Sequence, residues 1–151
     1  MNDTPLSGRL ALVTGASAGI GAAAARSFAA AGAHVVCCAR RADSLEAVVA
    51  DCNSAEALVL DVTDASACAD SLVERPFDIV LANAGIAIGT AGLVDGDVSE
   101  WSQVIDTNVK GVLNTIRPVL GGMRDRGRGH VITLGSVAGR QVYPGGNVYC
   151  A

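Results

Sequence analysis

The chain has 151 residues, of which 50% are hydrophobic, 17% charged and 3% aromatic. This composition suffices for one globular domain and excludes a disordered, collagen-like or low-complexity chain. Fifteen acidic residues against 11 basic ones give a net charge of −4, which argues against nucleic acid as a partner.

Strand-like and helix-like segments alternate along the chain. Short apolar runs predict strands, and alanine-rich or helically spaced apolar residues predict helices between them. The strands are expected at 9–14, 33–39, 57–60, 78–81 and 130–134, and the helices at 20–31, 44–53, 64–74 and 98–123. Pro118 should bend the last helix, and a further helix should start near residue 151. The pattern predicts an α/β fold: a Rossmann-type, doubly wound parallel sheet of five strands with helices on both faces, in one domain over residues 1–151.

The cysteines and the apolar runs indicate where the protein works. The five cysteines are odd in number and lack CxxC spacing, so we expect free thiols, no metal site and a cytoplasmic protein. Residues 1–8 lack the pattern of a signal peptide. No apolar run reaches the roughly 18 residues that a membrane helix needs, so we expect no membrane partner.

The segment TGASAGIG lies between the first predicted strand and the first predicted helix. Glycines at a helix start allow a pyrophosphate to approach the free N–H groups there. A turn without a ligand would also need glycine, but three glycines with two hydroxyl side chains exceed that need. We therefore expect cofactor contacts at Gly15, Ser17, Gly19, Ile20 and Gly21.

Two arginines follow the second predicted strand, where NAD-binding proteins carry an acidic residue. Arg40 and Arg41 suit a ribose 2′-phosphate, because guanidinium groups bind phosphate oxygens in a bidentate manner. The sequence therefore favours NADP(H) over NAD(H). The alternative, that both are solvated residues at a helix entry, is stronger for Arg41 than for Arg40.

Further along the chain, short motifs follow the third, fourth and fifth predicted strands. Together with the glycine loop they resemble, in order and context, those of the short-chain dehydrogenase/reductase family. They are Asp61-Val62, Asn83-Ala84-Gly85, Asn108, Ser136, and Tyr149, which follows 13 positions after the serine. The resemblance implies that Asp61 and Val62 line the adenine pocket, with the Asp61 carboxylate accepting from the exocyclic amine. It also implies that residues 83–85 pass beside the nicotinamide ribose.

The same resemblance implies three catalytic residues. Tyr149 would be the acid/base, Ser136 would fix the substrate oxygen, and Asn108 would hold a water. Taken singly, each has an alternative: a turn cap for Ser136, a core residue for Tyr149, and a bond to its own helix for Asn108. The spacing of Ser136 and Tyr149, combined with the glycine motif, favours catalysis. Tyr143 is expected as a wall of the substrate pocket.

Segments 83–89, 105–111 and 143–149 resemble the NADP-dependent 3-hydroxy acid dehydrogenases within that family. This implies interconversion of a small secondary alcohol, such as serine or a 3-hydroxyacyl compound, and its ketone, by a homo-oligomer (dimer or tetramer). A 3-oxoacyl thioester reductase and a non-catalytic dinucleotide-binding module remain alternatives. Family members are longer and carry a lysine four positions after the tyrosine. We therefore expect the 151 residues to lack the C-terminal strands and to be inactive alone.

Overall fold

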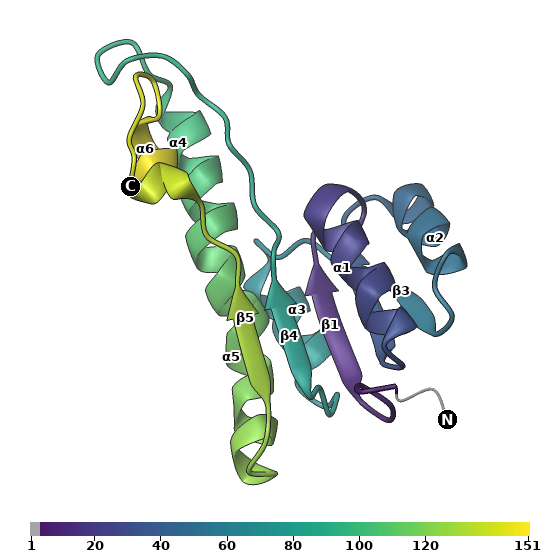
Figure 1. The fold of residues 1–151 in the computed structure, drawn as a ribbon. Coiled ribbons are helices and arrows are strands. Elements are labelled where there is room, and N and C mark those ends of the chain that lie inside the picture. The colour runs from purple at the N-terminus through teal and green to yellow at the C-terminus, as the bar shows by residue number, and fades with distance from the viewer. Residues whose placement is uncertain (1–3) are drawn as a thin grey trace.

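Five parallel strands form one sheet in the order β3-β2-β1-β4-β5 in the computed structural model, which describes residues 4–151 (Figure 1). The order reverses between β1 and β4, and a ligand crevice is expected at the carboxyl ends of the strands on either side of such a point. The strands are β1 Leu10–Thr14, β2 His34–Ala39, β3 Ala55–Val59, β4 Ile79–Ala82 and β5 His130–Thr133.

Helices cover both faces of the sheet, as the alternating pattern predicted (Figure 1). α1 and α2 pack on one face, and α3 and α5 pack on the other. The helices are α1 Gly19–Ala30, α2 Ala42–Ala50, α3 Ala65–Leu72, α4 Val98–Ile105, α5 Gly111–Asp125 and α6 Asn147–Cys150, with a π-helical turn at Asp106–Lys110 and a 3-10 turn at Val137–Gly139. Within residues 4–151, none of these helices combines the length and apolar character of a membrane span.

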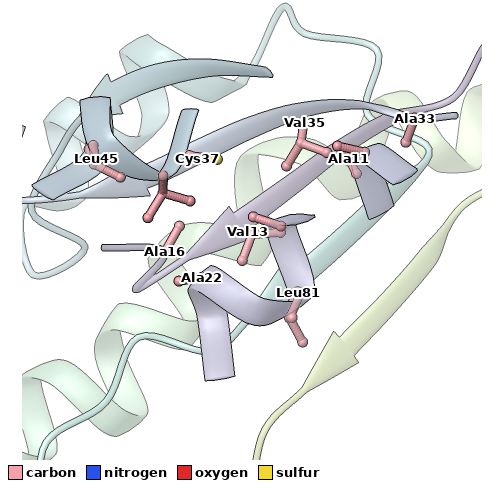
Figure 2. Close-up of a cluster of buried hydrophobic side chains, with 12 residues drawn as sticks. Ala11, Val13, Ala16, Ala22, Ala33, Val35, Cys37, Leu45 and Leu81 are labelled. Carbon is pink, nitrogen blue, oxygen red and sulfur yellow. The ribbon is translucent and has the colours of Figure 1, made fainter. Parts of the chain in front are cut away.

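Two separate cores arise because successive side chains of a strand point to opposite faces of the sheet. Val13 and Cys37 face the core under α1 and α2, which Figure 2 shows in close-up. Their neighbours Leu12 and Cys38 face the core under α3 and α5. Burial raises the pKa of the Cys37 thiol to about 11 and that of the Cys38 thiol to about 12. Both are free thiols, as expected from the sequence.

The predicted element boundaries are close to those observed, including those of the long helix. β3 starts at Ala55 rather than at 57, and α2 spans Ala42–Ala50 rather than 44–53. Asp64 caps α3, since its carboxylate accepts from the N–H of Ala67 at 2.9 Å. Residues 1–3, part of the segment judged not to be a signal peptide, lie outside the described residues.

The long helix predicted over residues 98–123 is present as an uninterrupted helical run over residues 98–125. A π-helical turn at Asp106–Lys110 is inserted between α4 and α5, and Pro118 lies within α5. The apolar periodicity continues through the π turn, so the sequence pattern gave no signal of it. The turn contains Asn108, whose side chain bonds to a distant loop rather than to its own helix. Inserted π turns of this kind are frequent at functional sites.

Candidate active site

A cleft of about 990 Å3 lies at the carboxyl ends of the strands, beside the switch point between β1 and β4. Every expected cofactor-binding and catalytic residue lines this cleft except Gly21, and Tyr143, expected as a wall of the substrate pocket, does not line it either. At one end lie Arg40 and Arg41, and its wall also includes Ser136 and Tyr149. The structure thus brings together residues from seven separate segments of the sequence.

The glycines of the loop between β1 and α1 have different roles. Gly15 and Gly19 have φ angles of +66° and +55°, which side chains other than hydrogen rarely permit. A Cβ on Gly21 would lie 2.3 Å from the carbonyl oxygen of Gly15, so Gly21 permits close packing within the loop. A Cβ on Gly19 would have no neighbour within 4 Å, because this glycine borders the open cleft. Gly19 therefore leaves the backbone at the start of α1 open to the cleft.

Thr14 joins the end of β1 to the loop after β4. Its buried Oγ1 accepts from the backbone N–H groups of Asn83 and Ala84, each at 3.1 Å. In return, the Asn83 Nδ2 donates to the Thr14 carbonyl at 2.8 Å. These bonds fix residues 83–85 beside the glycine loop. The sequence placed Thr14 at the start of the motif but did not identify its hydroxyl as the link, because the partners are about 70 residues away.

The basic end of the cleft contains both arginines, Ser17 and Asp61. Arg41 Nη2 donates to Ser17 Oγ at 3.1 Å, so this exposed side chain lies against the glycine loop. Arg40 Nη1 lies 3.9 Å from Asp61 Oδ2. All of these groups are solvent-accessible, so the ion pair contributes little to stability. Their convergence provides cationic donors beside a hydroxyl group.

Asn108 fixes the loop that follows Gly85. Its Oδ1 accepts from the N–H of Ile86 and its Nδ2 donates to the carbonyl of Ile86, both at 2.8 Å. These two bonds leave one lone pair of Oδ1 and one N–H of Nδ2 unused. The side chain holds the wall of the cleft in place across 22 residues of sequence.

Ser136 and Tyr149 both lie in the segment that follows β5, and both line the cleft. Ser136 Oγ accepts from the N–H of Ala138 at 3.1 Å, so it caps the 3-10 turn while its side chain borders the cleft. Tyr149 lies half-buried on α6. The Asn147 Nδ2, which donates to the carbonyl of Ala91, ties the start of α6 to the loop before α4. Tyr143, expected in the substrate pocket, is not among the cleft-lining residues of the described chain.

Comparisons with known proteins agree with this architecture. The family model for short chain dehydrogenases matches residues 9–151. The NADP-dependent 3-hydroxy acid dehydrogenase of Salmonella typhi is 38% identical over 94% of this chain and 60% of its own length. The serine 3-dehydrogenase of Rhizobium radiobacter is 40% identical over 91% of this chain and 57% of its own. The glycine betaine reductase of Emericella nidulans is 42% identical over 97% of this chain but only 12% of its own.

Solved structures give the same result. The serine dehydrogenase of Escherichia coli superimposes with a TM-score of 0.87 at 37% identity, over 93% of this chain and 68% of that one. A closed form of serine dehydrogenase complexed with NADP+ gives a TM-score of 0.88 at 37% identity, over 93% of this chain and 59% of that one. The fold is a doubly wound α/β sheet of Rossmann type with a glycine loop at its switch point. The chain belongs to the short chain dehydrogenase family, and it spans about 60% of the length of the 3-hydroxy acid dehydrogenases that it matches.

Proposed function

We propose that the protein is an NADP(H)-dependent oxidoreductase that interconverts a small alcohol and the corresponding aldehyde or ketone. The favoured substrate is a 3-hydroxy acid such as serine or a 3-hydroxyacyl compound. The observation that carries this proposal is a single cleft lined by the glycine loop, two arginines, Ser136 and Tyr149. The names of relatives at 38% and 40% identity, an NADP-dependent 3-hydroxy acid dehydrogenase and a serine 3-dehydrogenase, support it.

The residues present fit a dinucleotide that carries a 2′-phosphate. Gly19 offers unobstructed backbone at the start of α1, where the helix dipole favours an anion. Arg40, Arg41 and Ser17 would hold the 2′-phosphate, and Asp61 would accept a hydrogen bond from the adenine amine. When bound, NADP(H) supplies or accepts the hydride.

The chain's own residues would prepare the reacting carbonyl. The Ser136 hydroxyl would donate to the substrate oxygen, and the Tyr149 phenol would deliver the proton to it. Asn108, which holds both ends of the Ile86 backbone, would keep the adjacent wall in place. Ile20, Val62 and Ala84 also line the cleft and would contribute further contacts to the cofactor.

A 3-oxoacyl thioester reductase is the second candidate. A solved structure described as a putative betaketoacyl-ACP reductase superimposes with a TM-score of 0.89 at 37% identity. It would use the same cleft and the same proton donor, and it would differ in the acyl carrier of the substrate. Assays with a hydroxy acid and with an acyl thioester separate the two.

We also propose that the protein assembles into a homo-oligomer and works in the cytoplasm. Exposed apolar side chains follow the helices α4 and α5, and an uncovered apolar stripe favours association. They include Ile105, Val109, Leu113 and Leu120. The free state of all five cysteines supports a reducing compartment.

Oxidation assays with the natural full-length protein test the proposed reaction. With NADP+ and either L-serine or 3-hydroxybutyrate, the near-ultraviolet absorbance of the reduced nicotinamide should rise. Tyr149→Phe should lower kcat by at least about 100-fold, because it removes only the proton donor. A wild-type protein inactive on both alcohols and on a 3-oxoacyl thioester would overturn the proposal.

The cofactor preference has its own test in the same protein. Arg40→Asp replaces a phosphate donor by a carboxylate that repels phosphate, so it should weaken NADPH binding at least about tenfold more than NADH binding. Arg117→Ala, an exposed arginine of α5 away from the cleft, is the matched control and should change neither. Equal losses for the two cofactors would show that Arg40 does not contact the 2′-phosphate.

A further inference from the structure

Asn114, on α5, contacts the loop that follows β3. Its Nδ2 donates to the carbonyl oxygen of Val62 at 2.9 Å, across 52 residues of sequence. The helix comes close enough for this bond because residue 111 is glycine: a Cβ there would lie 2.7 Å from Cγ2 of Val62. Val62 is buried and Asn114 is half-buried, so the bond is partly shielded from water. The helix that follows the π turn is thus joined to the loop that carries Asp61.

The peptide between Val62 and Thr63 is held at both ends. Its oxygen accepts from Asn114 at 2.9 Å and from the Cys68 thiol at 3.8 Å, and its N–H donates to Oδ1 of Asp61 at 2.9 Å. The Thr63 hydroxyl donates to the same Oδ1 at 2.8 Å. Two donors therefore fix one oxygen of the Asp61 carboxylate, and Oδ2 is left beside the cleft, 3.9 Å from Arg40 Nη1. The orientation of this carboxylate depends on the orientation of the peptide.

We infer that Asn114 is a positioning residue for base recognition: by fixing the Val62–Thr63 peptide, it aims the Asp61 carboxylate at the exocyclic amine of adenine. The inference rests on the proposed function, because it assumes that the cleft binds NADP(H). A carboxylate oriented before binding loses little conformational freedom when the amine arrives. Without the amide of Asn114, the peptide oxygen keeps only the weak thiol donor of Cys68, so the peptide can rotate and one donor to Oδ1 leaves its place. The loss falls on discrimination between bases rather than on the reaction itself.

The test compares NADPH with its hypoxanthine analogue, in which a carbonyl oxygen replaces the 6-amino group. The variants are Asn114→Asp, which keeps the shape but removes the donor, and Asn114→Ala, which removes the whole amide. Arg117→Ala is the control on the same helix. The Arg117 side chain is exposed, and within residues 4–151 it forms no hydrogen bond or ion pair. Dissociation constants come from fluorescence titration of the natural full-length protein, and kcat is measured at saturating cofactor.

The wild-type protein should bind NADPH about tenfold more tightly than the hypoxanthine analogue, because a hydrogen bond to a charged group is lost. In both Asn114 variants this ratio should fall to about two, with kcat within about twofold of wild type and Arg117→Ala unchanged. An unchanged ratio in the variants would overturn the inference, whether or not overall affinity falls. A wild-type protein that binds neither nucleotide would instead overturn the proposed function.

Discussion

Replacing Gly21 and Gly19 by alanine in separate variants should give opposite outcomes for stability and binding. A Cβ on residue 21 would lie 2.3 Å from the Gly15 oxygen and 2.6 Å from Asn83 Nδ2, so the loop must move. Overpacking costs about 1–3 kcal/mol, and disturbing the bond from Asn83 to Thr14 adds about 1 kcal/mol. Gly21→Ala should therefore lower the free energy of unfolding by about 2–4 kcal/mol and Tm by about 5–15 °C.

A Cβ on residue 19 would have no atom within 4 Å, so the loss of stability in Gly19→Ala comes only from the φ angle of +55°. That conformation costs an alanine about 1–2 kcal/mol, partly offset because alanine restricts the unfolded chain. Tm should fall by only about 2–5 °C. The added methyl would occupy the space beside the cleft where the pyrophosphate is proposed to lie, so NADPH binding should weaken at least about tenfold.

Thermal unfolding followed by circular dichroism and fluorescence titration with NADPH measure the two effects on the same preparations. Gly19→Ala should be the more stable of the two variants in thermal unfolding and the weaker binder of NADPH in the titration. If Gly19→Ala were the less stable variant and still bound NADPH as wild type does, the division of roles between these glycines would be refuted.

Two further predictions concern the sheet itself. Thr14→Val removes the acceptor for the N–H groups of Asn83 and Ala84 and should lower the free energy of unfolding in urea by about 1–3 kcal/mol, whereas Thr14→Ser should lower it by less; equal losses would contradict this role. Burial raises the pKa values of Cys37 and Cys38 to about 11 and 12 from an ordinary 9.0, so their contribution to stability is complete below pH 9 and is lost as pH rises toward 11–12. Between pH 8 and 10.5, wild type should therefore lose more unfolding free energy in urea than the Cys37→Ala/Cys38→Ala variant, and parallel losses would exclude the thiols as the cause.

The alternation of strands and helices was predictable because both are local consequences of hydrophobic periodicity. A buried run such as residues 10–13, ended by Thr14 and Gly15, indicates a central parallel strand whatever lies far away. The positions of the candidate residues followed from the same rule, since the carboxyl ends of parallel strands meet at one edge of the sheet. The cleft that brings Gly19, Arg40 and Tyr149 to one surface confirms that edge.

The features that the sequence did not reveal depend on contacts between distant residues. The π turn at Asp106–Lys110 accompanies a pair of bonds between Asn108 and Ile86, and no residue within the helix indicates it. The bond from Asn114 to Val62 is hidden for the same reason. Periodicity shows which face of a helix is buried, but it does not show which backbone groups of another loop need a partner.

A crystal structure of the natural full-length protein with NADP+ bound is the most direct test of the proposed cofactor site. We predict that the 2′-phosphate lies within hydrogen-bonding distance of the guanidinium groups of Arg40 and Arg41, that the pyrophosphate lies beside Gly19, and that the nicotinamide ring lies next to Tyr149. A nucleotide bound outside this cleft, or one bound in it with its 2′-phosphate away from both arginines, would contradict the account.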